Sequence, residues 1–187
     1  ATLAVYLPEA IDALLAYPYG CSEQVASTLR TLATASRAMR YVSATNTILY
    51  RGESYTVEGV MTEGLANIIK NQKPDGGFAY YADLNSNLYL TESVLTSLTA
   101  IEEAGYDVPV TAITRSASYV ANTLLYSVPS YGGQWSARDY VRGLLALRNV
   151  EGFASDKAQL GARVSTLLSA TSNWKERIDN GALIDLS

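Results

Sequence analysis

Hydrophobic residues recur every three or four positions along most of the chain, the spacing of one face of an α-helix. The segment 88–104 shows this pattern clearly. Leu90, Val94 and Leu98 fall on one stripe, and Gly105 then provides a natural stop for the helix. The same periodicity predicts helices over residues 4–16, 21–39, 56–70, 88–104, 110–125, 137–148 and 156–168.

Alternation of apolar and polar residues, which is typical of a half-buried strand, is weak everywhere. The best candidate strand, residues 46–50, sits in a connection between two predicted helices. The glycine-rich stretches 74–77 and 130–133 have the composition of turns between helices. We therefore predict an all-α fold.

A repeat is visible in the turns. Gly20, Gly76 and Gly132 are 56 residues apart, and each precedes an amphipathic helix. A unit of two helices and a glycine turn, repeated, is how helical arrays and α/α toroids are built. Three such units and a remainder make about half of a closed ring of six helical hairpins, so we expect a partial toroid.

The composition favours one globular domain. The chain has 187 residues, of which 48% are hydrophobic and 17% charged. A net charge of −4, with basic residues scattered singly, argues against a nucleic-acid partner. No apolar stretch reaches the ~20 residues of a membrane span. The N-terminus lacks the features of a signal peptide, so we expect that one was removed or that this is a piece of a longer chain.

Histidine is absent, and Cys21 is the only cysteine. The lack of histidine excludes Ser-His-Asp and Cys-His catalysis and most zinc sites, so no metal is expected. A single cysteine excludes an internal disulfide.

Cys21 and Gln24 lie three residues apart at the start of a predicted helix, just after Pro18 and Gly20. Residues at this spacing share one helix face, so the Cys21 thiol can approach the Gln24 amide carbon. A thiol that displaces ammonia from this carboxamide forms an intramolecular thioester. Spacing alone leaves open the alternative that Cys21 is unreactive, because a lone cysteine near a helix start usually acts as a small hydrophobic residue.

The sequence Pro-Tyr-Gly-Cys-Ser-Glu-Gln at 18–24 resembles the thioester signature of α2-macroglobulins and complement components. That signature usually reads Pro-Tyr-Gly-Cys-Gly-Glu-Gln, so six of seven positions match. Ser22 is the departure, and it favours a bacterial or archaeal source. The segments 71–78, 89–94, 104–109 and 136–146 also resemble family segments. The resemblance therefore runs from about residue 4 to about residue 146.

The resemblance implies an α/α toroid in which Cys21 is the thioester sulfur and Gln24 the acyl donor, supported by Tyr19, Gly20 and Glu23 of the signature. Residues 1–187 would then be a thioester-containing domain, incomplete and excised from a much longer chain. Such a chain is not an enzyme but a broad-spectrum endopeptidase inhibitor. After cleavage of a bait segment elsewhere in the parent chain, a lysine amine of the protease attacks the thioester.

The partners implied by the resemblance are proteases and the other domains of the parent chain, with no cofactor. The implied location is the periplasm, the cell surface or the extracellular space. Some complement relatives use a histidine to transfer the acyl group to hydroxyls, and here direct attack by amines or water is expected instead. Arg138 and Asp139 lie near where that histidine falls, although a solvated helix face is the alternative interpretation. Tyr89 stands where the family often has tryptophan.

The chain contains fourteen tyrosines, and several flank glycine turns and could line the mouth of the toroid. Tyr17 and Tyr19 are the best candidates for an aromatic shield that keeps water from the thioester. The alternative is that tyrosines cap helix ends with an apolar body and a polar tip. Tyr80, Tyr81 and Tyr131 flank such turns as well. Glu23 is expected to favour the helix start through the dipole, with acid–base help as a weaker alternative.

Two rival functions remain open. An α/α toroid can be a glycosidase with two carboxylates facing each other, here Glu92 and Asp139. That hypothesis predicts activity that survives Cys21→Ala, and it leaves the thioester signature unexplained. The other rival is a non-covalent scaffold or binding module with a vestigial motif.

Overall fold

The computed structural model describes residues 21–39, 47–50, 52–81, 83–130 and 132–170. Helices dominate this part of the chain, and a single β-hairpin joins two of them, so the predicted all-α class is confirmed. The predicted helix over 4–16 lies outside the described residues. In chain order the elements are α2 (Ser22–Met39), β1 (Thr47–Tyr50), β2 (Glu53–Thr56), α3 (Val57–Lys70), α4 (Leu88–Glu103), α5 (Val110–Tyr126), α6 (Ala137–Leu147) and α7 (Ala154–Ser169).

Polar side chains cap the starts of α3, α4 and α6. The hydroxyl of Thr56 accepts a hydrogen bond from Gly59 N at 3.0 Å at the start of α3, and the Asn87 side chain accepts one from Leu90 N at 3.0 Å at the start of α4. Each bond satisfies a backbone donor that the helix itself leaves unpaired. Gly105, with φ of +91°, follows the end of α4 as predicted.

The hairpin β1–β2 is the main local feature that the hydrophobic pattern did not predict. The two strands pair antiparallel, with Tyr50 opposite Glu53 and Thr47 opposite Thr56. The candidate strand at 46–50 is confirmed, but its partner was not predicted. Each strand has four residues, which is too short for an alternation pattern to stand out.

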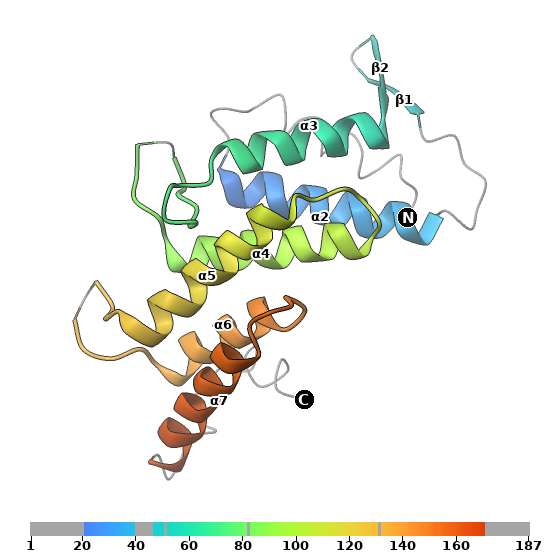
Figure 1. The fold of residues 1–187 in the computed structure, drawn as a ribbon. Helices are drawn as coiled ribbons and strands as arrows, with labels where there is room; N and C mark the ends of the chain where they lie inside the picture. The colour runs from blue at the N-terminus through green and yellow to red at the C-terminus, as the bar shows by residue number, and fades with distance from the viewer. Residues whose placement is uncertain (1–20, 40–46, 51, 82, 131, 171–187) are drawn as a thin grey trace.

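The helices pack in pairs, as the glycine repeat predicted. Helix α2 contacts α3, α4 contacts α5, and α6 contacts α7, while α4 also contacts both α2 and α6. Figure 1 shows α2, α4 and α6 running in the same direction, so that their N-terminal ends lie on one side of the molecule. This is the arrangement of an α/α toroid segment, with α2, α4 and α6 side by side and α3, α5 and α7 covering them.

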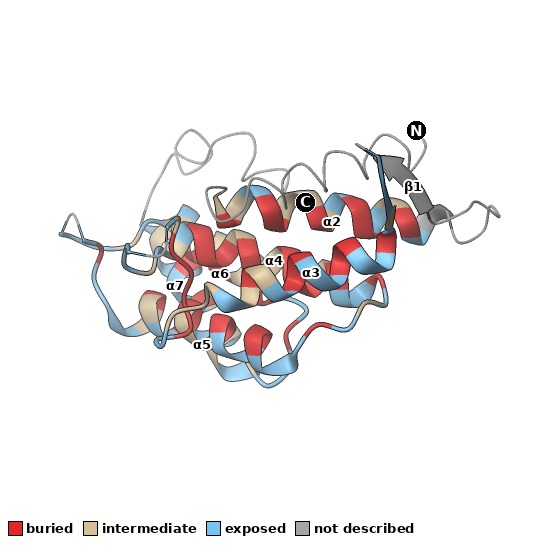
Figure 2. Ribbon diagram, turned by 90° about the horizontal axis from the view of Figure 1, so that it is seen from above, coloured by how far each residue is buried: buried red, intermediate tan, exposed pale blue. Residues whose placement is uncertain are grey.

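The core lies between the helices of the two layers, where buried residues face one another (Figure 2). Helix α4 is central, because it packs against neighbours on several sides, and even its polar residues Thr91, Glu92 and Ser97 are buried. Close packing uses glycine at two crossings. A Cβ on Gly64 would lie 2.6 Å from Leu29 Cδ1, and one on Gly143 would overlap the Leu124 side chain.

None of the described helices combines the length and the apolar character needed to cross a lipid bilayer. The two longest, α2 and α5, both carry polar residues throughout.

Candidate functional site

Cys21 immediately precedes α2, and Gln24 lies in the first turn of that helix. The backbone N–H of Val25 donates to the carbonyl of Cys21 at 3.3 Å, which closes this first turn. Cys21 is half-buried and Gln24 is exposed, so the pair sits at the surface end of the helix. Tyr17, Tyr19 and Gly20 of the predicted shield and signature lie outside the described residues, whereas the signature residue Glu23 is half-buried in the first turn of α2.

Ser22, the position at which the motif departs from the usual signature, forms a long-range tether. Its hydroxyl donates to the carbonyl of Ala79 at 3.2 Å, and the two residues are each only 2% exposed. A glycine at this position has no hydroxyl and cannot make the bond. The start of α2 is therefore fixed to the loop that precedes α4.

The loop segment 77–80, which we call the strap, is held at further points. Phe78 N donates to the hydroxyl of Thr91 at 2.9 Å, and Asn87 N donates to the carbonyl of Phe78 at 2.8 Å. Phe78 itself is fully buried. The backbone of the strap thus has little freedom beside the start of α2.

Tyr80, at the end of the strap, directly follows Ala79, the residue that is bound to Ser22 of the motif. Burial raises the pKa of the Tyr80 phenol above its ordinary value, and the charges of Glu23 and then Cys21 raise it further. Tyr89 adds to the rise in this pKa, whereas Arg142 opposes it. The phenol of Tyr80 is thus exposed to the charges both of the motif and of Arg142 in α6.

The tether beside Tyr80 was not predicted, because the sequence analysis ranked the tyrosines by their distance from Cys21 along the chain. The repeat of glycines every 56 residues could have predicted that the strap lies near the motif. The strap follows Gly76, which is the repeat equivalent of the glycine just before Cys21, so both segments belong at the same end of the helix array.

A carboxyl–guanidinium pair joins α4 and α6, with Glu92 buried and Arg142 partly exposed. Arg142 of α6 contacts the Glu92 carboxylate of α4 at 2.9 Å, and its guanidinium lies 4.0 Å from the centroid of the Tyr89 ring. Burial raises the pKa of Glu92 to about 8, although Arg142 acts in the opposite direction and Asp139 adds to the rise. Among the described residues, Glu92 Oε1 has no hydrogen-bond partner. The contact between Glu92 and Arg142 joins α4 to α6, and burying these charged groups costs desolvation free energy.

Glu92 and Asp139, the predicted glycosidase pair, are both engaged in the structure of the domain. Glu92 is bound to Arg142, while Asp139 completes a capping box with Ser136 at the start of α6. Asp139 Oδ2 accepts hydrogen bonds from the backbone N–H and the hydroxyl of Ser136, at 2.9 and 2.7 Å. Arg138 is exposed in the first turn of α6.

Two hollows border the ion pair. One, of about 340 Å³, is lined by side chains that include Tyr89, Tyr119, Trp135 and Asp139. The other, of about 400 Å³, includes Arg30 of α2 and opens between α2, α4 and α6. Glu92 and Arg142 line both hollows.

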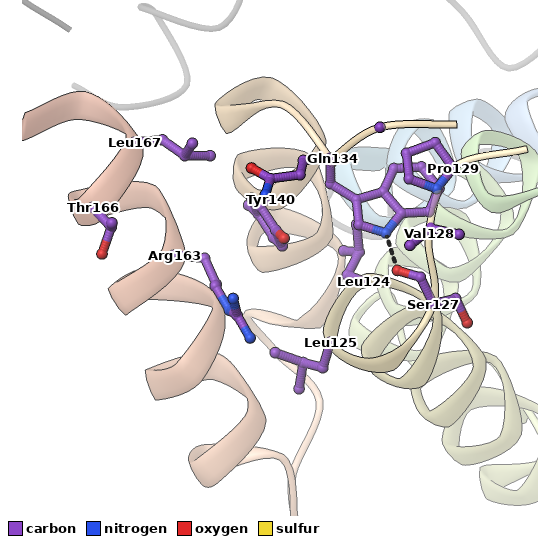
Figure 3. Close-up of a pocket in the computed structure, with 12 residues that line it drawn as sticks. Leu124, Leu125, Ser127, Val128, Pro129, Gln134, Tyr140, Arg163, Thr166 and Leu167 are labelled. Carbon is purple, nitrogen blue, oxygen red and sulfur yellow. Dashed lines mark hydrogen bonds between the residues drawn. The ribbon is translucent and has the colours of Figure 1, made fainter. Parts of the chain in front are cut away.

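A third hollow, of about 340 Å³, lies where the end of α5 meets α6 and α7 (Figure 3). The indole N–H of Trp135 donates to the carbonyl of Ser127 at 2.9 Å and holds the α5–α6 connection in place. Neither Cys21 nor Gln24 is among the described residues that line this hollow, so it is separate from the motif.

Comparison with known proteins places the chain in a family. Residues 1–149 match the family model described as the A-macroglobulin TED domain, in which TED denotes the thioester-containing domain. The chain therefore belongs to the family of A-macroglobulin thioester-containing domains. It is similar to alpha-2-macroglobulin of Escherichia coli (strain K12), with 30% identity over 188 residues.

That alignment covers 86% of this chain and 11% of the relative, so the chain spans only a small part of the relative's length. The crystal structure of native alpha-2-macroglobulin from Escherichia coli, spanning domain MG7 to the C-terminus, matches with a TM-score of 0.55 and 23% identity. This match covers 86% of this chain and 25% of that chain. At this identity the likeness supports the fold.

Proposed function

We propose that this chain is the thioester-bearing domain of an α2-macroglobulin-like inhibitor of endopeptidases, rather than an enzyme. The observation that carries the proposal is the Cys21–Gln24 pair at the start of α2, within a chain that belongs to the thioester-containing family. The Cys21 thiol attacks the Gln24 carboxamide, ammonia leaves, and an internal thioester forms. Residues 1–187 would be an incomplete part of this domain within a longer parent chain.

Capture follows from the chemistry of a thioester. A lysine amine of the attacking protease adds to the acyl carbon of Gln24, the carbon–sulfur bond breaks, and an amide joins the two proteins. Bait cleavage elsewhere in the parent chain would provide the trigger, so the partners are proteases and the remaining domains. Tyr17 and Tyr19 stay proposed as a shield against water. Function in the periplasm or outside the cell fits the capture of foreign proteases.

The direct test is covalent capture by the parent protein. Incubation with a protease and denaturing electrophoresis would show a band that combines the two chains and withstands reduction. Cys21→Ala should abolish this band because no thioester can form. Ser27→Ala, a change on the same helix outside the motif, is the matched control and should leave the band intact.

The two rival functions predict different results in the same assay. A non-covalent scaffold gives no combined band from either the parent protein or its variants. A glycosidase would cleave glycosides equally well after Cys21→Ala and lose activity after Glu92→Gln. The engagement of Glu92 with Arg142, and of Asp139 with Ser136, favours structural roles for both carboxylates.

A further inference from the structure

In the proposed capture reaction, the motif alone provides no side chain that stabilises the leaving sulfur atom. When the amine displaces Cys21, negative charge develops on the sulfur as the carbon–sulfur bond breaks. A hydrogen-bond donor beside that atom stabilises the transition state, and histidine, the usual group for proton transfer, is absent from the chain. A different donor near Cys21 would speed the direct attack by amines.

The strap places one candidate there by its backbone geometry. Ser22 follows Cys21 directly and is bound to the carbonyl of Ala79, which is followed directly by Tyr80. The strap is anchored again at Phe78 through its bonds to Thr91 and Asn87. The backbone of Tyr80 therefore has a fixed position relative to the first turn of α2.

The charges of two motif residues act on the phenol of Tyr80, and this phenol is able to donate a hydrogen bond. Its pKa is raised by burial and by the charges of Glu23 and Cys21, so the hydroxyl keeps its proton at neutral pH. The side chain is half-buried and packs against the core, which limits its movement. The adjacent Tyr81 is 53% exposed and does not share this environment.

We propose that Tyr80 donates a hydrogen bond from its phenol to the Cys21 sulfur while the attacking amine displaces that sulfur from the Gln24 acyl carbon. This inference rests on the proposed thioester function. The amine nitrogen bonds to the acyl carbon, and the electron pair of the carbon–sulfur bond passes to sulfur. The proton released by the amine ends on the sulfur, so the products are an amide and a thiol, and Tyr80 remains a neutral phenol.

The test compares variants of the full parent protein in their reaction with methylamine, followed by thiol release. Tyr80→Phe keeps the ring but removes the donor, and we expect thiol release to slow by about tenfold to a hundredfold, the worth of a hydrogen bond to a charged group. Tyr81→Phe is the matched control and should react at the wild-type rate. A thermal melt of each variant checks that the fold is retained.

The outcomes separate this inference from the function on which it rests. If the wild-type parent carries no thioester, the proposed function fails. If the thioester is present and Tyr80→Phe reacts as fast as wild type, the donor role is wrong while the function stands. A purely shielding Tyr80 would also overturn the inference: Tyr80→Phe would then react normally, and only Tyr80→Ala would hydrolyse faster in water.

Discussion

Ser22 shows how one hydroxyl can connect two segments that are 57 residues apart in the sequence. Ser22 and Ala79 are both buried, so the carbonyl of Ala79 has no ready access to water if the hydroxyl is removed. The same bond sets the position of the strap and hence of Tyr80. Stability and site geometry at the start of α2 therefore depend in part on this residue.

Replacing Ser22 with alanine tests this tether. We expect Ser22→Ala to lower the free energy of unfolding by about 1 kcal/mol, because a buried carbonyl loses its donor. Urea denaturation of the two proteins measures the change. Thr31→Ala removes an exposed hydroxyl that bonds within its own helix and should have a much smaller effect. Equal effects from the two substitutions would show that the tether contributes nothing specific.

Glu92 provides a prediction about pH. Its pKa is raised from 4.5 to about 8 in the folded protein, so the folded state holds this proton more tightly than the unfolded state. The contribution of Glu92 to stability is therefore fully present below pH ~4.5 and is lost as pH rises through about 8. Glu92→Gln cannot ionise and should lack this loss.

The measurement is the free energy of unfolding by urea at pH 5 and pH 8 for both proteins. We expect the wild type to lose on the order of a few kcal/mol more than Glu92→Gln between these values. Glu102→Gln, an exposed position on the same helix, is the control and should follow the wild type. Parallel pH dependence of wild type and Glu92→Gln would contradict the raised pKa.

At the scale of the elements, the crossing of α5 and α6 depends on a glycine. Gly143 brings the backbone of α6 so close to α5 that any Cβ would overlap the Leu124 side chain. Gly161 in α7 is also helical, but a Cβ there would meet nothing within 4 Å. The two glycines therefore form a matched pair in which only the packing differs.

Alanine at these two positions should have opposite effects. We expect Gly143→Ala to destabilise the domain by about 1–3 kcal/mol through overpacking. Gly161→Ala should stabilise it by up to about 1 kcal/mol, since alanine is the better helix former and space is available. Thermal or urea unfolding checks both. A stabilising Gly143→Ala would show that α5 and α6 pack less closely than the structure indicates.

Most helix boundaries could be predicted from the sequence, because apolar periodicity and glycine stops are local signals. The helix predicted over 88–104 is found at Leu88–Glu103, and that predicted over 156–168 at Ala154–Ser169. The partner strand Glu53–Thr56 was missed, since a four-residue strand carries too little pattern. The pairing of Glu92 with Arg142 was missed for another reason. It depends on how α4 meets α6 in three dimensions, which periodicity does not specify.

At the scale of the whole molecule, the glycine repeat predicted the arrangement of paired helices. The N-terminal ends of α2, α4 and α6 lie on one side of the molecule (Figure 1), and the Ser22–Ala79 bond joins the first turn of α2 to the loop before α4. The motif was recognisable from local spacing. The tether that brings the segment before Tyr80 to the motif was not recognisable, because the Ser22–Ala79 bond joins residues that only the fold brings together.

The central claim is that Cys21 and Gln24 form a thioester, and intact mass of freshly made parent protein before and after methylamine tests it most directly. The account predicts a mass short by one ammonia and no titratable thiol at Cys21. One thiol should then appear as one methylamine adds, and Cys21→Ala should show neither change. An unmodified mass with a free Cys21 thiol from the start would contradict the covalent mechanism.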